Sequence, residues 1–344
     1  MPISSPDTYH VLLSDIGDTL ESGRVRAYQS VNTLLVQTYW NIGRHIVIYE
    51  QRGNEKAEYG SHLFDRLARD LRDKYGEVFS RSSLIYIRKL YLLYPIGESL
   101  IHQLTWTHYI ELLKLDNPIE RGFYEKQTVL ERWSVRELKR QKKTALFQRL
   151  ALGRNKAEII QLAARGNQLD TAADLVRDPY VLEFLGLSAF SQHSESELEN
   201  LLISKLQQFL LELGKGFAFI GRQYRIMLDN RHYRVDLVFY HRILKCFVLI
   251  DLKTGRLDHG DVGQMNMYLN YFRKEENMSD DNEPIGIILT AEKDEILAEY
   301  TLGGLTNQIF VSKYQFYLPD KSELESQLRA VLDETEHEKE NDIV

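Results

Sequence analysis

Two neighbouring apolar segments in the second half of the chain carry charged residues where an ordinary buried strand has none. Segment 234–241 is rich in β-branched and aromatic residues and contains Asp236, and segment 246–253 ends in Asp251 and Lys253. Both compositions are typical of β-strands. Because alternate strand residues point to one face, Asp251 and Lys253 should project together. A hairpin through residues 242–245 would bring Asp236 to the same side.

Carboxylates and an ammonium group in an apolar hairpin cost free energy unless another group pairs with them. A divalent cation is the simplest such group. Mg²⁺ takes oxygen ligands in proteins, usually one or two carboxylates together with waters and a phosphate. The two segments therefore predict a metal site that holds Mg²⁺, for which Mn²⁺ could substitute.

The length of 344 residues predicts two domains, with one as the alternative. The single cysteine, Cys246, excludes an intramolecular disulfide and fits a reducing compartment. No signal sequence is visible at the N-terminus, and no apolar run reaches the about 20 residues that a membrane-spanning helix needs. We therefore expect a cytoplasmic protein without a membrane partner.

Charge is unevenly distributed along the chain. The net charge of −7 does not by itself indicate a nucleic-acid-binding protein, but residues 81–150 contain thirteen Lys and Arg against seven Asp and Glu. Such a region can contact phosphates, as in a helix-turn-helix reader, or can be the solvated face of a helical bundle. Residues 326–344 form an acidic tail, and we expect its stretch 333–342 to be disordered.

Periodicity divides the chain into a helical first half and a mixed second half. Expected helices in the first half cover 23–50, 61–75 and 80–94 and begin again near Thr105 and Ser134. The second half is expected to contain a helix over 197–213 capped by Ser196, strands over 217–220, 224–228, 233–240 and 247–253, a helix over 261–274, a strand over 285–290, a short helix over 294–300 and a strand over 309–311. This order is typical of an α/β sandwich. The predicted fold class is α+β, with a helical domain over 15–175, an α/β domain over 190–325 and a tail over 326–344.

These segments resemble the YhcG-like bacterial family, in which a helical N-terminal domain precedes a PD-(D/E)XK nuclease domain. The resemblance is carried by segments 235–242 (VDLVFYHR), 249–255 (LIDLKTG) and 263–268 (GQMNMY) of the second half. Segments 104–109 (LTWTHY), 133–138 (WSVREL) and 178–185 (DPYVLEFL) resemble the N-terminal domain and its junction. The resemblance implies a restriction-endonuclease-like fold, and it covers nearly the whole chain except the tails. Many relatives have Glu where this chain has Asp251, and the superfamily accepts either.

The resemblance also implies roles for individual residues. Asp236 and Asp251 would bind the metal ion, with the carbonyl group of Leu252 as a third ligand. Lys253 would hold the attacking water or neutralise charge in the transition state. Glu199 matches the superfamily's helical glutamate, which serves a second metal ion or supports the first. Gln264 matches a position that orients the lysine or the water.

The expected activity is therefore Mg²⁺-dependent hydrolysis of DNA phosphodiester bonds, as an endonuclease. A structure-specific nuclease that resolves junctions is one alternative, and a nucleic-acid-binding assembly factor with little cleavage activity is another. A homodimer is left open, because superfamily members often pair two active sites to address two strands. Arg222, Gln223 and Arg234 flank the strands and would either contact phosphates or be solvated.

Overall fold

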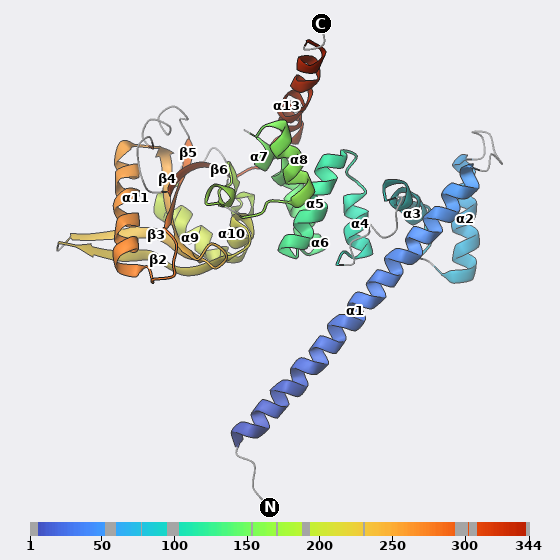
Figure 1. Ribbon diagram of the computed structural model, residues 1–344, viewed down its shortest axis with the longest axis horizontal. Helices are drawn as coiled ribbons and strands as arrows, with labels where there is room; N and C mark the ends of the chain where they lie inside the picture. The colour runs from blue at the N-terminus through green and yellow to red at the C-terminus, as the bar shows by residue number, and fades with distance from the viewer. Residues whose placement is uncertain are drawn as a thin grey trace, which may run out of the picture. The chain divides into compact units, whose positions relative to one another are not determined.

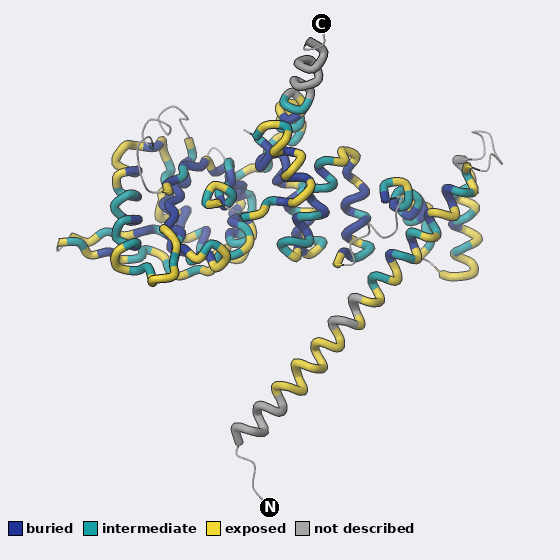
Figure 2. The backbone as a smooth tube through the Cα atoms, viewed as in Figure 1, coloured by how far each residue is buried: buried dark blue, intermediate teal, exposed yellow. Residues whose placement is uncertain are grey.

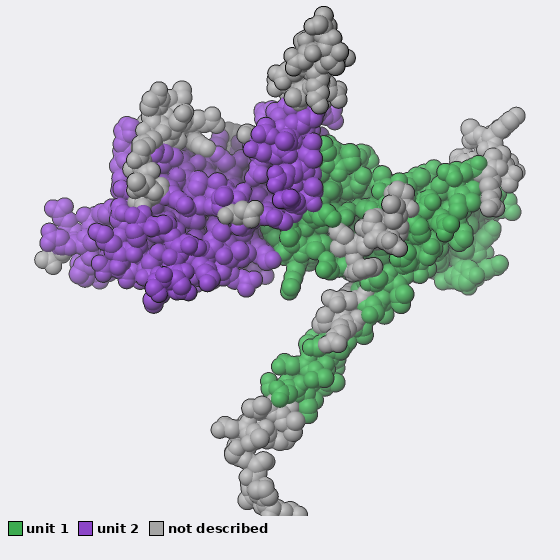
Figure 3. Space-filling view, viewed as in Figure 1, with its two compact units in different colours: residues 1–139 green, residues 140–344 purple. Residues whose placement is uncertain are grey.

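The computed structural model describes residues 6–51, 60–76, 78–94, 103–152, 154–169, 171–187, 193–229, 231–292, 302 and 308–341. The chain divides into two compact units, residues 1–139 and residues 140–344, coloured separately in Figure 3. The division falls within one helix, α6, so helices α7 and α8 that follow it belong to the second unit. The domain ranges expected from the sequence were 15–175 and 190–325.

The first unit is helical (Figure 1). Its helices begin at side-chain caps that the sequence signals: Ser80 accepts a hydrogen bond from the Ser83 N–H, and Thr105 forms a capping box with His108. Its elements are α1 (Pro6–Gln51), α2 (Gly60–Tyr75), α3 (Arg81–Leu93), α4 (Trp106–Leu112), α5 (Pro118–Glu131) and the start of α6 (Val135–Lys143).

Helix α1 begins far before residue 23, where we expected its start. Its first half is exposed over most of the described side chains, whereas Val36, Tyr39 and Ile46 near its end are buried (Figure 2). The amphipathic pattern that predicted the helix from residue 23 therefore extends beyond the buried part, since Val31 and Leu34 are 65% and 67% exposed.

The second unit is built on a mixed sheet that has six strands among its described residues, in the order β1-β6-β5-β4-β3-β2 (Figure 1). Strands β2, β3 and β4 are antiparallel neighbours, and β4, β5, β6 and β1 are parallel. The strands are β1 (Tyr180–Val181), β2 (Phe217–Leu228), β3 (Arg231–His241), β4 (Cys246–Arg256), β5 (Ile285–Glu292) and β6 (Gln308–Gln315). The helices are α7 (Leu146–Ala151), α8 (Lys156–Arg165), α9 (Glu195–Ser204), α10 (Leu206–Leu213), α11 (His259–Tyr271) and α13 (Lys321–Asn341).

Helices cover both faces of this sheet. Leu198 and Leu202 of α9 and Phe209 of α10 pack on one face, against a cluster that includes Leu237 and Ile250. Helix α11 packs on the other face through the residues Val262, Met265, Tyr268 and Leu269. A β-carbon at Gly286 of β5 would lie 2.6 Å from Met265 Cγ, so α11 approaches the sheet too closely there for a side chain. The result is the α+β sandwich that the sequence predicts.

Three details of this unit differ from the sequence expectations. The helix expected over 197–213 is two helices, because Lys205 leaves helical geometry, and its cap is Ser194 with Glu197 rather than Ser196. Strand β2 continues through 221–223, and a register shift lies just before this segment, between Phe219 and Gly221. The tail expected to be disordered is helical as α13, since its Glu, Lys and Leu residues favour helix and Lys321 pairs with Glu325 at 3.4 Å.

The short helix expected over 294–300 lies outside the described residues. Within the part of the chain that the structure describes, no helix is both long and apolar enough to cross a membrane.

Candidate active site

The ladder between β3 and β4 stops at the two predicted aspartates. It pairs His241 with Cys246 through to Leu237 with Ile250, so the predicted hairpin through 242–245 is confirmed. One step further along the same register, Asp236 lies opposite Asp251. There the ladder is replaced by a side-chain contact, since the Leu252 N–H donates to Asp236 Oδ2 at 2.8 Å. The two carboxylates thus lie where the strands separate.

Gln223 holds Asp236 from the other side. The β2–β3 register pairs Arg222 with Leu237 and Tyr224 with Val235, so Gln223 lies opposite Asp236. Its side-chain Nε2 donates to Asp236 Oδ1 at 3.0 Å and to Glu199 Oε2 at 2.6 Å. Its φ of 48° lies in the left-handed region that residues other than glycine seldom adopt. One amide therefore joins the β3 aspartate to the α9 glutamate.

Asp251 and Lys253 project together, as alternation along β4 predicts. Asp251 is 3 % exposed, and Lys253 Nζ lies 2.9 Å from its Oδ2. The two groups form an ion pair, and this buried oxygen accepts no well-aligned hydrogen bond from the residues that the structure describes. A second carboxylate, Asp261 of α11, lies 3.5 Å from the same ammonium.

The electrostatic consequences are large at Asp251. Burial, followed by the charge of Asp236, raises the pKa of Asp251 from its ordinary 3.8 to about 7, although Lys253 acts in the opposite direction. Burial lowers the pKa of Lys253, but the neighbouring carboxylates, with Asp251 foremost, together raise it by more, so it lies above its ordinary value of 10.5. Burial raises the pKa of Glu199, which the hydrogen bond from Gln223 partly offsets. Lys253 is therefore a cation at neutral pH, whereas the raised pKa of Asp251 leaves its carboxyl group partly protonated there.

The remaining predicted residue, Gln264, lies on α11. Its side-chain amide donates to the Tyr268 hydroxyl, which in turn donates to the Arg234 carbonyl oxygen at 2.8 Å. Gln264 is therefore hydrogen-bonded to a tyrosine that is anchored to β3. Tyr268 itself is fully buried.

Sequence reasoning missed the roles of Gln223 and Asp261 in this arrangement. A signal for Gln223 existed, because Leu228 pairs with Arg231 and leaves a two-residue connection. Counting back from that connection puts Gln223 opposite Asp236. Asp261 had a weaker signal, as the third residue after the Asp258 cap of α11, where it completes a capping box.

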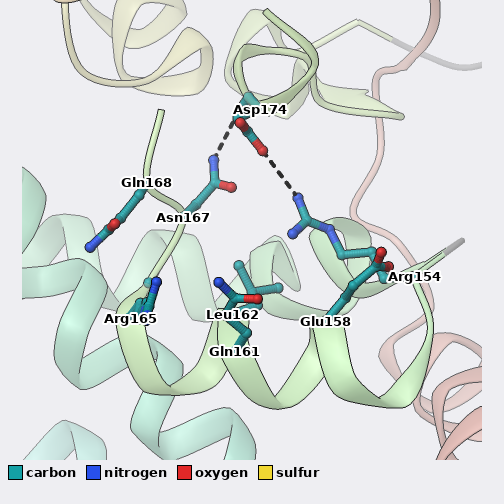
Figure 4. A pocket seen from close by; sticks show the side chains of 9 residues that line it. Arg154, Glu158, Gln161, Leu162, Arg165, Asn167, Gln168 and Asp174 are labelled. Carbon is teal, nitrogen blue, oxygen red and sulfur yellow. Dashed lines mark hydrogen bonds and ion pairs between the residues drawn. The ribbon is translucent and has the colours of Figure 1, made fainter. Parts of the chain in front are cut away.

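An open pocket of about 470 Å³ lies beside these groups on the α9 side of the sheet. It is lined by Glu195, Ser196, Glu199, Asn200, Arg222, Gln223, Arg234 and Asp236. Another polar pocket, of about 340 Å³, lies along α8 and contains none of the predicted site residues. Figure 4 shows it partly closed by its own side chains, with Arg154 paired to Asp174 at 3.8 Å.

The described residues contain no group of three or more His, Cys, Asp or Glu side chains arranged to hold a metal ion. Glu199 meets Asp236 through Gln223 rather than joining both aspartates in one cluster. Its role as a metal ligand stays a prediction. Asp251 offers a buried carboxylate oxygen without a hydrogen bond, and this is the group in the site that a cation would satisfy.

Known proteins resemble this chain in both halves. Residues 173–329 match the YhcG PDDEXK nuclease domain, and residues 15–149 match the DUF1016 N-terminal domain. The Escherichia coli (strain K12) protein named "Putative nuclease YhcG" is 38% identical over 361 residues, which cover 95% of this chain and 96% of that protein.

Two solved structures share part of the chain at low similarity. A repair endonuclease from Pyrococcus abyssi is 20% identical, with a TM-score of 0.25, over 38% of this chain and 49% of its own. An EndoMS–dsDNA2 complex is 17% identical, with a TM-score of 0.26, over 39% of this chain and 47% of its own. The match thus spans about half of each of those chains. The identity to the Escherichia coli protein along nearly the full length, together with the nuclease-domain match over the sheet that carries Asp236 and Asp251, shows that this chain belongs to the YhcG family of PDDEXK nucleases.

Proposed function

We propose that the protein is a Mg²⁺-dependent endonuclease that hydrolyses phosphodiester bonds of DNA. The observation that carries the proposal is the buried Asp251 Oδ2, which has the Lys253 ammonium at 2.9 Å and accepts no well-aligned hydrogen bond from the described part of the chain. A buried carboxylate without a hydrogen bond is costly in a folded protein unless a ligand compensates it. A small hard cation supplies that compensation.

Three groups would hold the cation. Asp236 and Asp251 lie opposite each other where β3 and β4 separate. The N–H and C=O of one strand residue point to the same edge, and the Leu252 N–H points to Asp236, so the Leu252 carbonyl faces the same gap. When bound, a divalent cation polarises the phosphoryl oxygen and lowers the pKa of a coordinated water.

Lys253 would act as a fixed positive charge. Its raised pKa keeps the ammonium protonated at neutral pH, so it donates hydrogen bonds and does not accept a proton. Placed beside Asp251, it would position the attacking water or stabilise the negative charge that develops on the phosphate. Asp261, at 3.5 Å, limits the directions in which the ammonium can turn.

Glu199, Gln223 and Gln264 would support these groups. Gln223 fixes the orientation of Asp236 through its 3.0 Å hydrogen bond and places Glu199 within reach of a second cation or a water. Gln264 acts through Tyr268, whose hydroxyl contacts the backbone of β3 two residues before Asp236. Removal of supporting hydrogen bonds of this kind commonly lowers metal affinity or activity by about 10–100-fold.

The proposed partners are DNA and a second copy of the chain. On α1, Ile16 and Leu20 are 49% and 60% exposed, and a β-carbon added at Gly23 would meet no atom within 4 Å. An antiparallel second α1 would place Leu20 against Gly23 and Ile16 against Ala27, large side chains against small ones at heptad spacing. Light scattering should then report a dimer that Leu20→Glu converts to a monomer, whereas a monomeric wild-type protein would contradict this pairing.

The helical region over 15–175 would recognise DNA or a protein partner, next to a nuclease domain over 190–325 and the acidic segment 326–344. Its basic stretch over 81–150 supports a contact with phosphates.

Cleavage assays test the proposal directly. Purified protein should nick or cut DNA with Mg²⁺ or Mn²⁺ and not with EDTA, and Asp251→Ala or Lys253→Ala should lower the rate by at least about 100-fold. A panel of linear, nicked, branched and single-stranded DNA, together with RNA, separates a general endonuclease from a structure-specific one. Cutting in EDTA, full activity in both variants, or cutting of RNA alone would overturn the assignment.

A further inference from the structure

Strands β2 and β3, residues 217–241, form a two-stranded arm whose end extends past α11 (Figure 1). This arm is basic. Between residues 217 and 241 it contains four arginines and two aspartates, in a chain with a net charge of −7. Its two faces differ. Tyr224, Ile226 and Tyr233 point to the α11 side and join the apolar cluster there. Arg225 and Arg234, which alternate with them, point to the α9 side and are exposed.

Arg225 and Arg234 lie directly opposite each other in the ladder. Like charges at directly opposite positions of two antiparallel strands are destabilising. Within the described part of the chain, neither guanidinium forms an ion pair with a carboxylate, and Arg225 contacts only the His232 ring, at 3.1 and 3.3 Å. The pair therefore concentrates positive charge on one face without a compensating group from the protein.

This face is continuous with the active-site pocket. Arg234 lines the pocket together with Glu199, Gln223 and Asp236. The Arg225–Arg234 pair is two residues further along both strands than the Gln223–Asp236 pair, a distance of roughly 7 Å at the usual rise of a strand. Arg222 marks the other edge of the pocket, where its guanidinium donates to Asn200 Oδ1 at 2.8 Å.

We propose that the α9-side face of the β2–β3 arm, formed by Arg222, Arg225 and Arg234, binds the phosphate backbone of the DNA and leads the strand into the active-site pocket. The inference rests on the proposed function for its choice of ligand. Guanidinium groups bind phosphates through paired hydrogen bonds, and an anion between Arg225 and Arg234 would remove their mutual repulsion. Contacts of this kind orient the DNA and carry no sequence information.

Binding measured without cleavage tests this surface separately from the nuclease activity. Fluorescence anisotropy of the full chain with a labelled DNA duplex in EDTA gives the dissociation constant as a function of salt concentration. Arg225→Gln/Arg234→Gln should weaken binding about 10–100-fold at low salt and reduce the slope of log K against log salt by about 2. Arg225→Lys/Arg234→Lys keeps both charges and should retain most of that slope.

A matched control removes the same charge elsewhere in the second unit. Arg256 and Arg273 are paired with Glu292 and Glu283, at 2.8 and 2.5 Å, so Arg256→Gln/Arg273→Gln should leave the slope nearly unchanged. Circular dichroism and urea unfolding establish that each variant is folded. An unchanged slope in the arm variant, or an equal loss in the control, would overturn the inference even if the wild-type protein cuts DNA. Arm-dependent binding by a protein that cuts nothing would instead reject the proposed function alone.

Discussion

The second unit contains two buried carboxylates whose surroundings are opposite. Glu212 is fully buried, and its oxygens accept hydrogen bonds from Arg149 Nη1 at 2.8 Å, the Val181 N–H at 2.9 Å and Arg140 Nη2 at 3.2 Å. Asp251 is almost as buried, yet its Oδ2 has the Lys253 ammonium at 2.9 Å and accepts no well-aligned hydrogen bond from the described residues. Burial alone therefore does not distinguish the two carboxylates, whereas the number of their partners does.

The pKa values of the two groups are shifted in opposite directions, in line with their surroundings. Burial raises the pKa of Glu212, but Arg149, Arg177 and Arg140 lower it by more, so the net shift is downward. Burial and a neighbouring carboxylate raise the pKa of Asp251 to about 7. The protein's own cations outweigh the effect of burial at Glu212, whereas at Asp251 the single ammonium of Lys253 does not.

Glu212→Gln should have the largest effect on stability. Gln keeps the shape of the side chain, but it leaves Arg149, whose side chain is fully buried, without a compensating negative charge. Removing one partner of a buried ion pair costs about 3–5 kcal/mol, and urea unfolding followed by circular dichroism would measure it. Because the pKa of Glu212 is lowered in the folded state, the difference from wild type should shrink as the pH falls below the ordinary glutamate value of 4.5.

Glu183→Gln is the matched control for that experiment. Glu183 pairs with Arg140 at 3.2 Å at the edge of the same cluster, where its side chain is 23% exposed. Its loss should cost about 1 kcal/mol or less, because water can solvate the remaining charge. We call Glu212 with Arg140, Arg149 and Arg177 the closed cluster. Equal losses of stability in the two variants would contradict the distinction between this cluster and its exposed edge at Glu183.

Asp251→Asn should change the free energy of unfolding by an intermediate amount, and it should stabilise the protein where Glu212→Gln destabilises it. Without metal, the folded wild-type protein retains a proton on Asp251 between about pH 4 and pH 7 that the unfolded chain has lost. The free energy of unfolding of the wild type therefore falls as the pH rises through this window. Asn does not titrate, so at pH 8 the variant should be more stable than the wild type by roughly 1–3 kcal/mol, and at pH 4 by much less.

Divalent metal should reverse this advantage. Mg²⁺ or Mn²⁺ in excess should raise the melting temperature of the wild type at pH 8 and leave that of Asp251→Asn unchanged. A wild-type stability that is independent of pH between 4 and 8, or a metal shift that persists in the variant, would show that Asp251 is not the open carboxylate that the geometry indicates.

The sequence predicts the strands and their charges better than the contacts between them. Alternation along 246–253 places Asp251 and Lys253 on one side, and the hairpin through 242–245 sets the position of Asp236, since both follow from local geometry. Gln223 was harder to identify, because its side-chain contacts depend on a φ of 48° that no spacing rule requires. The Glu212 cluster was missed entirely, since residues far apart in the chain supply its arginines.

Arg225→Gln should have the smallest effect on the free energy of unfolding, and the sign of that effect tests whether this arginine stabilises the fold. Arg149→Gln, the matched change in the closed cluster, removes the ion pair and hydrogen bond to Glu212 and should destabilise the protein by about 3 kcal/mol or more. Arg225 faces another arginine, so its replacement removes a repulsion, and the free energy of unfolding should stay constant or rise by up to about 0.5 kcal/mol. The gain should disappear at high salt, where repulsion between exposed charges is screened. A loss above about 1 kcal/mol in urea unfolding would mean that this guanidinium stabilises the arm, and the unpaired arginines would then no longer distinguish a ligand-binding surface from the closed cluster.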